Sequence, residues 1–479
     1  MLRRDLDRLA GREHDLLVVG GGIHGATAAW EAASRGLSVA LVEADDFGAG
    51  TSWNSLKTIH GGLRHLQRLD VGGLRESARE RSVLLRIAPE LVHPLAFVVP
   101  ARGHGARGRE ALAAGLWLAD LLTADLRRRG GSALAPSAAL SRAQVRARVP
   151  GLDGHGLTGG ALWWDAQVAS SERLLLAFLH AAAAAGAVAA NHLEATSLLR
   201  HGRRVRGVAV RDTATGRAFE AAGRIVLNAA GPAADALLRT AGIARPAVPH
   251  LRAVNLVLRR PLTGDLAVGA PSEGRYLFSV PWRGRSIVGT AYAAESTPPL
   301  DLARDFVAEA ARALPWTGLR AADVALVHEG RVPGDGRRLV SRSRLVDHER
   351  EDGVLGVMTL VPAKYTTARA VAEALVDRAL GRLQRPWAPS RTALTPLPEA
   401  RPLEGTLEER TRTAVREEMA LTLADAVLRR LDLGTAGEPP AADVERVARV
   451  MAEDLGWDAA RGAAEVEALA AFYGRRRLA

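Results

Sequence analysis

The chain has 479 residues, 48% of them hydrophobic, and a formal net charge of +11. That length suffices for two or three domains with large buried cores, and the composition excludes a disordered or fibrous protein. The absence of cysteine excludes disulfides, thiolate metal sites, thiol nucleophiles and a cysteinyl-linked flavin. Any redox chemistry must therefore come from a bound cofactor, and we expect no metal site.

The surplus of basic residues suits anionic metabolites, anionic lipid or nucleic acid, and by itself selects none of them. No zinc-finger, RNP-type or helix-turn-helix pattern stands out, so we expect no nucleic-acid partner. Residues 1–15 lack the apolar stretch of a secretory signal, and the Ala-rich stretch 174–190 is interrupted by His180 and Gly186. These features predict a cytoplasmic protein in which 174–190 is a buried helix.

Residues 15–43 read as strand, glycine turn, helix and strand. Gly20, Gly22 and Gly25 form G-x-G-x-x-G, in which the first glycine permits a tight turn, the second lets a pyrophosphate approach and the third brings helix against strand. The helix N-terminus supplies N–H groups and a positive dipole to the phosphates. Glu43, at the end of the second strand, is placed to accept hydrogen bonds from adenosine ribose hydroxyls, which favours FAD or NAD over NADP.

Two later segments favour FAD. Residues 48–52, which include Thr51 and Ser52, form a polar segment suited to pyrophosphate and flavin contacts, where a nicotinamide enzyme would usually continue as a doubly wound domain. Residues 225–232 read as a strand that runs into a turn at Gly231. This turn is similar to the second FAD-contacting strand turn of glutathione-reductase-like flavoproteins, and a plain strand-end turn is the alternative.

The segment 91–150 contains a strand at 95–99 and an apolar stretch at 111–122. Arginines stand on both sides of this stretch, around Trp117, which is typical of a helix lying on a membrane surface or on a partner. An ordinary amphipathic helix of the domain is the alternative.

A second G-x-G-x-x-G occurs at Gly103, Gly105 and Gly108. The residues after it are rich in arginine, and no strand-terminal acidic residue follows about twenty positions later. We therefore interpret this copy as a loop.

The rest of the chain alternates between strand and helix patterns and ends in helices. A hairpin is predicted at 205–220, and alternating apolar segments at 250–330 predict an antiparallel sheet. The domain organisation that we predict is an FAD-binding domain at 1–90, 151–240 and 335–385, a substrate domain at 91–150 and 241–334, a Pro-rich linker at 386–405, and a helical C-terminal domain at 406–479, with helices at 406–432, 441–456 and 461–475.

Lysine is nearly absent. Only Lys57 and Lys364 are lysine, against 62 arginines. A bias toward arginine replaces lysine wherever a generic positive charge suffices, so the two survivors are candidates for places that need a compact ammonium. Chance retention at the surface is the alternative.

The segment 55–66 resembles the K-x-I-H-G-G-L-R-Y-L segment of FAD-dependent glycerol-3-phosphate dehydrogenases and oxidases, of the DAO superfamily. The C-terminal segment 417–430 is similar to the helical C-terminal domain of that family. Four further similar stretches follow in the same order, at 228–232, at 280–282 with 287–290, at 341–342, and at 363–367. The resemblance covers nearly the whole chain, and both lysines fall inside its motifs.

The resemblance implies a fold, a cofactor and a reaction. The fold class is α/β, or α+β overall: a glutathione-reductase-like FAD-binding Rossmann domain with an inserted antiparallel substrate domain and a helical C-terminal domain. The cofactor is FAD. The reaction is oxidation of glycerol 3-phosphate, or a close analogue, to a ketone such as dihydroxyacetone phosphate by hydride transfer to flavin N5.

The resemblance also implies site residues. The catalytic candidates are Arg64, His65, Arg342 and Lys364, and the substrate-binding candidates are Lys57, His60, Asn255 and Arg331. Thr366 and Thr367 match the segment whose backbone meets the pyrimidine edge of the flavin, and Lys364 suits stabilisation of negative charge on the reduced ring. His65 and His60 are the candidate bases for the hydroxyl proton, and a purely structural role is the alternative for each.

Three positions depart from the family pattern. His65 stands where the family has tyrosine, and Asn255 where it usually has histidine. In the run 330–333, Arg331 is displaced by one position, which turns a side chain on an extended segment to the other face. We therefore expect a phosphate clamp that differs from that of the family.

The sequence leaves several functions and partners open. The substrate is expected to be a small anion, most simply a phosphorylated polyol. Oxidation of another hydroxy acid, polyol phosphate or amine is one alternative, and a basic membrane- or nucleic-acid-binding protein without catalysis is another. A quinone acceptor, an anionic membrane surface and a homo-oligomer also remain open.

Overall fold

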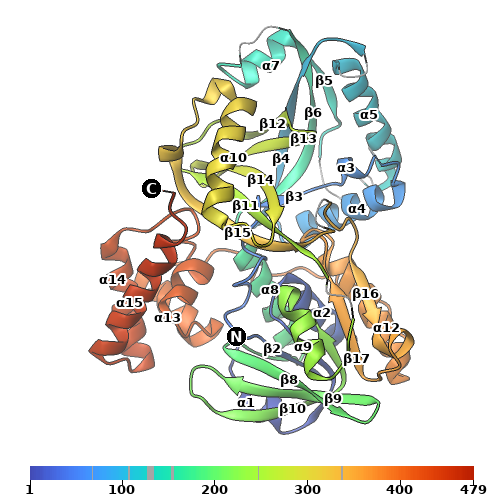
Figure 1. The fold of residues 1–479 in the computed structure, drawn as a ribbon, viewed down its shortest axis with the longest axis vertical. Coiled ribbons are helices and arrows are strands. Elements are labelled where there is room, and N and C mark those ends of the chain that lie inside the picture. The colour runs from blue at the N-terminus through green and yellow to red at the C-terminus, as the bar shows by residue number, and fades with distance from the viewer. Residues whose placement is uncertain are drawn as a thin grey trace.

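The computed structural model describes residues 1–66, 68–105, 108–126, 134–152, 156–245, 248–335 and 338–478. The chain forms one sheet with helices around it, a second and larger sheet, and a group of helices at its C-terminal end (Figure 1). The predicted mixed α/β fold with a helical C-terminal part is confirmed.

The first sheet contains the nucleotide-binding strands. Its strand order is β16 (Arg344–Asp347), β17 (Val357–Val361), β10 (Ala218–Asn228), β1 (Glu13–Val19), β2 (Val39–Val42) and β7 (Val188–Ala190). The strands β17, β10, β1, β2 and β7 run parallel, and nearly continuous apolar sequence is expected for strands that are buried on both faces. The predicted hairpin at 205–220 is confirmed, because β9 (Arg204–Asp212) pairs antiparallel with β10 and with β8 (Leu193–His201).

Three helices bury their apolar faces beside this sheet. They are α2 (Ile23–Ser34), α8 (Ser171–Ala184) and α12 (Ala368–Leu383). α8 is the predicted buried helix, and α2 packs against both other helices. Among the residues that the structure describes, no helix is both long and apolar enough to span a membrane. The short elements nearby are α1 (Leu6–Ala10), α9 (Ala234–Thr240), α11 (His348–Glu351) and the 3₁₀ turn η2 (Gly231–Ala233).

The second sheet is the predicted antiparallel substrate sheet, with one parallel pair, β4 and β12. Its order is β15 (Val324–Pro333), β11 (His250–Leu258), β14 (Arg285–Ala294), β13 (Arg275–Trp282), β12 (Leu266–Ser272), β4 (Val92–Arg102), β6 (Leu157–Val168) and β3 (Thr58–Ile59), with β5 (Ala138–Ser141) beside β6. Around it lie α5 (Arg109–Leu122), α7 (Arg142–Arg148), α10 (Pro299–Ala313) and the 3₁₀ turns η3 (Pro315–Thr317) and η4 (Ala321–Asp323).

The predicted domain boundary at residue 151 is wrong. β6 follows that boundary but pairs with β4 over nearly its whole length, so 157–168 belongs to the substrate sheet. β3, inside the predicted 1–90 piece, also joins that sheet through β6. An alternating apolar pattern predicts a strand but does not reveal which sheet supplies its hydrogen-bond partners.

The second glycine copy is a loop, as predicted. Gly103 and Gly105 follow β4 with φ angles of +74° and +77°, and Gly108 precedes α5. β4 belongs to the second sheet, where it pairs with β6 and β12, so these glycines lie outside the parallel strands of the first sheet.

The C-terminal helices are α13 (Leu407–Glu418), α14 (Ala441–Leu455) and α15 (Ala459–Gly474). The predicted continuous helix 406–432 is interrupted, because Met419 adopts φ +56° and ends α13 before a π-helical turn, η5 (Asp425–Arg430). The Pro-rich linker has no helix or strand and packs on the first sheet's core through Leu397 and Ala400.

Two helices lie where the sheets meet. α3 (Leu63–Leu66) carries the Gly-Gly-Leu-Arg-His segment, and α4 (Val71–Ile87) follows it. α4 contacts both β4 and α12, so the segment before it faces the start of α12 (Figure 1). This junction brings the predicted catalytic residues together.

Candidate cofactor and substrate site

The turn between β1 and α2 leaves little room for side chains. Gly20 has φ +109°, and a Cβ there would stand 2.5 Å from the Ala229 carbonyl oxygen. A Cβ on Gly25 would overlap the carbonyl oxygen of Gly20, and one on Gly22 would stand 3.2 Å from Ser52 Oγ. The backbone of the turn is therefore free of side chains on the side that a pyrophosphate would approach.

Polar groups surround this turn. The Gly21 N–H donates to Glu43 Oε2 at 2.5 Å, and the Ile23 N–H donates to Ser52 Oγ at 3.0 Å. Burial raises the pKa of the Glu43 carboxyl. Ser52 and Glu43 thus lie beside the glycine turn, as a dinucleotide site requires.

The starts of α2 and α12 and the turn after β10 also fit FAD. α2 begins at Gly22 without a side-chain cap, and His24 Nε2 in its first turn is buried without a partner. Burial lowers the pKa of His24 to about 4, so the ring is neutral near pH 7. Gly231 turns at φ +56° after β10, and Thr366 and Thr367 are buried at the start of α12. The residues Gly22 and Thr367, which cap α2 and α12, make no side-chain cap hydrogen bond, and helix N-termini of this kind suit the anionic parts of a dinucleotide.

Thr51 has a different environment from the one that we predicted. Its hydroxyl donates to the Arg331 carbonyl oxygen at 2.8 Å and accepts from the Arg331 N–H at 3.2 Å. The Thr51 side chain therefore joins the cofactor loop to β15, and cofactor contact would have to come from its backbone.

Three predicted catalytic residues and Asp70, which we did not predict, form a chain of polar contacts. Lys364 Nζ contacts His65 Nε2, and His65 Nδ1 donates to Asp70 Oδ2 at 2.8 Å. Arg342 pairs with the same Asp70 carboxylate. The structure thus brings together Lys364, His65 and Arg342, which lie far apart in sequence, and adds Asp70.

Asp70 is the functional candidate that the sequence reasoning missed. Its only signal was its place before a helical pattern, which predicts an N-cap. It is indeed the N-cap of α4, accepting from the Gly73 N–H at 3.0 Å.

Burial and nearby charges shift the pKa values of Lys364 and His65 downward. Burial lowers the pKa of Lys364; Glu76 and Asp70 oppose this, whereas Arg342 and Arg64 add to it. Burial also lowers the pKa of His65, and the Lys364 ammonium lowers it further. A histidine that is neutral near pH 7 can accept a proton.

Arg64 is exposed on α3 and makes no ion pair with any described residue. Its charge adds to the lowering of the Lys364 pKa and opposes the rise that burial causes in the Tyr292 pKa. Asn255 is buried deeper in the substrate sheet, where its Oδ1 accepts from the Thr290 hydroxyl at 2.7 Å. Arg64 therefore offers a guanidinium to solvent beside Lys364, whereas the Asn255 carbonyl is already used.

His60 lies apart from the His65 chain. Half of its side chain is exposed, and its Nδ1 is 3.4 Å from Asp165 Oδ2. Asp165 is buried and accepts from Arg81 at 2.6 Å and from the Gly61 N–H at 2.7 Å. Burial raises the pKa of Asp165, but His60 and Arg81 outweigh it and hold that pKa at about 2. Asp165 therefore stays an anion that orients His60.

The structure argues against substrate contact by Lys57. Its ammonium is fully buried and donates to Glu172 at 2.7 Å, to Ser171 Oγ at 2.8 Å and to the Trp53 carbonyl at 2.9 Å. An ammonium has three protons, and all three are used. The compact ammonium of Lys57 is therefore used in an internal ion pair. We correct the assignment of Lys57 as a substrate-binding residue.

Arg331 is also separate from the His65 chain. Its exposed guanidinium pairs with Glu295 at 3.0 Å, beyond the end of β14. The register places Arg331 opposite Arg252 on β11, and its described contacts do not reach Lys364. The displacement of Arg331 by one position thus places its side chain away from Lys364. We therefore also correct the assignment of Arg331 as a substrate-binding residue.

Comparison with known proteins agrees with this geometry. The family described as FAD dependent oxidoreductase matches residues 15–378, and the family described as the C-terminal domain of alpha-glycerophosphate oxidase matches 365–462. A protein named glycerol-3-phosphate dehydrogenase from Synechocystis sp. is 33% identical over 84% of this chain and 76% of its own length. One of the same name from Mycobacterium leprae is 34% identical over 81% of this chain and 66% of its own length.

Solved structures show a similar fold. The glycerol-3-phosphate dehydrogenase from Bacillus halodurans complexed with FAD has a TM-score of 0.75 at 22% identity, covering 98% of this chain and 96% of that one. The L-alpha-glycerophosphate oxidase from Mycoplasma pneumoniae with FAD bound has a TM-score of 0.55 at 18% identity, covering 82% of this chain and 100% of that one. The glycine turn, the family match and these folds together establish that the chain belongs to the FAD-dependent oxidoreductase (DAO) family, with a C-terminal domain of the alpha-glycerophosphate oxidase type.

Proposed function

We propose that this enzyme oxidises glycerol 3-phosphate, or a close polyol phosphate, to the corresponding ketone. The observation that carries the proposal is the group of three cationic side chains, Arg64, Arg342 and Lys364, beside a buried neutral histidine at the edge of the cofactor domain. Guanidinium groups bind phosphate through paired hydrogen bonds, and a neutral imidazole accepts a hydroxyl proton. The names of the relatives support the same substrate.

His65 is the proposed base. Bound FAD supplies the acceptor for the hydride that leaves the alcohol carbon. Nε2 of His65 takes the hydroxyl proton, while Nδ1 keeps its hydrogen bond to Asp70. Because the Lys364 ammonium contacts Nε2 in this structure, it must first move away, and an anionic substrate or the cofactor offers it another partner. His60 is the alternative base, oriented by Asp165.

Anaerobic flavin bleaching tests the substrate. We expect glycerol 3-phosphate to bleach the bound flavin much faster than glycerol, lactate or glycine do. Arg64→Met should reduce the advantage over glycerol, because only the phosphate gains from that guanidinium. Equal rates with glycerol and glycerol 3-phosphate would refute phosphate recognition, and faster bleaching by lactate or glycine would favour the hydroxy-acid or amine alternative.

We further propose that the enzyme works at an anionic membrane surface and passes its electrons to a quinone. The support is on α5, whose Trp117, Leu118 and Leu121 side chains are 63%, 45% and 73% exposed. Leu116 of the same helix is buried against the domain, so the exposed apolar residues form its outer side. Of the flanking arginines, residues 107 and 127–129 lie outside the described part of the chain.

Vesicle sedimentation tests this surface. At low salt we expect binding to anionic vesicles and loss of binding in Trp117→Glu. Trp387→Glu is a matched control, because Trp387 is 68% exposed and lies in the linker after α12. Binding that is insensitive to Trp117→Glu would contradict the proposal.

A further inference from the structure

The carboxylate of Asp70 lies between Arg342 and His65 and contacts both. Arg342 contacts it from the solvent side, with 55% of its side chain exposed. His65 contacts it from the interior, with 6% of its side chain exposed. A dissolved phosphate can therefore reach Arg342 but not the His65–Asp70 contact.

The local sequence is built for this contact. A Cβ on Gly73 would overlap both His65 and Asp70, and a Cβ on Gly72 would stand 3.1 Å from Arg342 Nη2. Glycine lowers the stability of a helix, so two glycines in the first turn of α4 need a reason. The reason is space: they let the imidazole and the guanidinium lie against the start of the helix.

We infer that Asp70 is a positioning residue that couples phosphate binding to the strength of the base. In the free enzyme Arg342 shares the Asp70 carboxylate with His65. When the substrate phosphate draws Arg342 away, Asp70 acts on His65 alone, and the imidazole becomes the stronger proton acceptor. The inference rests on the proposed function.

The different exposures of the Arg342–Asp70 and His65–Asp70 contacts favour this exchange. An exposed ion pair contributes little to stability, so Arg342 is easily taken by a phosphate, which accepts two parallel hydrogen bonds. The His65–Asp70 contact is less exposed and persists. The charged groups that act on His65 are Lys364, which lowers its pKa, Asp70, which raises it, and Arg342, which lowers it.

The test measures the pKa of His65 by NMR in the oxidised holoenzyme, with inorganic phosphate as the probe. We expect saturating phosphate to raise that pKa by about 1, the lower end of the effect of a close opposite charge. Arg342→Met should give the raised value without phosphate and no response to it. Asp70→Asn should give a low value that phosphate does not change, and asparagine still caps the helix, so this variant should fold.

A matched control comes from the same helix. Arg75 on α4 pairs with Asp125 at 2.7 Å, and both side chains are about two-fifths exposed. Asp125→Asn should leave the His65 pKa and its phosphate response unchanged. An unresponsive His65 in the wild type, a low pKa in Arg342→Met, or a full response in Asp70→Asn would overturn the inference.

Because no turnover is involved, these outcomes are separate from the proposed reaction. Failure of glycerol 3-phosphate to bleach the flavin would refute the substrate but leave the coupling measurable with phosphate. A second readout is the pH profile of flavin reduction. In Asp70→Asn its limb should move to lower pH, whereas a merely structural role would lower the rate without moving the limb.

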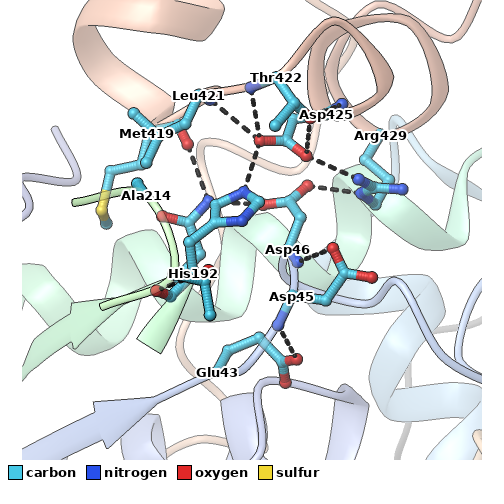
Figure 2. A network of polar contacts seen from close by, with 12 residues as sticks. Glu43, Asp45, Asp46, His192, Ala214, Met419, Leu421, Thr422, Asp425 and Arg429 are labelled. Atoms are coloured by element: carbon cyan, nitrogen blue, oxygen red, sulfur yellow. Dashed lines mark hydrogen bonds and ion pairs between the residues drawn. The ribbon is translucent and has the colours of Figure 1, made fainter. Parts of the chain in front are cut away.

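A buried cluster of charged side chains lies between the C-terminal domain and the cofactor domain. Asp46, His192 and Asp425 bring three potential metal-ligand atoms within 4.8 Å of one another, from the cofactor domain and from η5 (Figure 2). Arg429 donates to Asp46 at 2.5 Å and to Asp425 at 2.8 Å, and Arg430 donates to Asp46 at 2.6 and 2.8 Å. Guanidinium groups therefore supply the positive charge here, and a metal ion has no place.

Hydrogen bonds connect this cluster to the loop that carries Glu43. The Asp45 N–H donates to Glu43 Oε1 at 2.9 Å, and the Asp46 N–H donates to Asp45 Oδ1 at 2.9 Å (Figure 2). The His192 N–H, in the neighbouring β7–β8 turn, donates to the Asp45 carbonyl at 2.8 Å. Both segments follow the carboxyl ends of parallel strands, where dinucleotides bind.

We propose that the C-terminal domain holds the ribose-binding loop in its FAD-binding shape through Arg429 and Arg430. Arg430→Met should weaken FAD binding about tenfold, measured from flavin fluorescence on release. Arg416→Met is the control, because the ion-pair partner of Arg416 among the described residues is Asp454, inside the C-terminal domain, and its side chain is 65% exposed.

Thermal unfolding of the FAD-free protein separates this role from general stability. If Arg430 is only structural, Arg430→Met lowers the melting temperature of the FAD-free protein and leaves the FAD dissociation constant unchanged, and the proposal fails. If Arg430 holds the loop, the dissociation constant rises, and Asp46→Asn shows the same rise.

Discussion

Replacement of Lys364 tests the centre of the site. Lys364 is partly buried, its ammonium contacts His65 Nε2, and its Nζ is 3.4 Å from Ser77 Oγ. Methionine has a similar length and removes the charge together with these two contacts. Loss of one preorganised electrostatic stabiliser lowers a rate about 10²–10³-fold, so we expect Lys364→Met to reduce flavin bleaching by substrate about a hundredfold while FAD stays bound.

The same variant changes the pH dependence in a definite direction. Since Lys364 lowers the pKa of His65, its removal should raise that pKa, and the limb on which His65 loses its proton should move to higher pH. Lys364→Arg should also be slow, because a planar guanidinium does not fit the place of a compact ammonium. Stopped-flow bleaching at saturating substrate measures both effects, and a wild-type rate for Lys364→Met would refute the reasoning.

Three further predictions concern stability and cofactor binding. Lys57→Met leaves a buried carboxylate unpaired and should lower the free energy of unfolding by about 3–5 kcal/mol, whereas Arg75→Met, at an exposed pair, should cost under about 1 kcal/mol in urea titrations. Glu43→Ala should weaken FAD binding by about 1–3 kcal/mol, and undiminished flavin content would exclude the ribose role. Burial lowers the pKa of His328 to about 3, so between pH 6.5 and 3 the unfolded chain binds a proton that the folded chain does not. The free energy of unfolding should therefore fall as the pH falls through this range, less steeply in His328→Gln, and equal slopes would contradict the assignment.

The cofactor turn is predictable from the sequence because its causes are local. Gly20, Gly22 and Gly25 are close in sequence, and both the positive φ of Gly20 and the close approach of Gly25 to the Gly20 carbonyl oxygen arise within one βαβ unit. Glu43 follows from the same unit, at the end of the strand that pairs with β1. Strand and helix patterns there depend on neighbours a few residues away, so the pattern alone indicated the cofactor class.

The role of each lysine was decided by tertiary structure. Both occur in motifs of the family, yet Lys57 is closed into an ion pair with Glu172, whereas Lys364 remains beside His65 at the junction of the two sheets. Nothing in the sequence near either residue distinguishes these environments, because their partners lie 115 and 299 positions away. The partner of a charged side chain is a long-range property.

The same reason explains what the sequence reasoning missed. Asp70 reads as a helix cap. Its contact with His65 is local, but only the folded chain brings Arg342, 272 positions away, to the same carboxylate. β6 reads as a strand, and only its pairing with β4 assigns it to the substrate sheet. Local sequence therefore determined the elements and the cofactor, while long-range packing decided which charges meet, because ion pairs and strand partners form between residues that only the folded chain brings together.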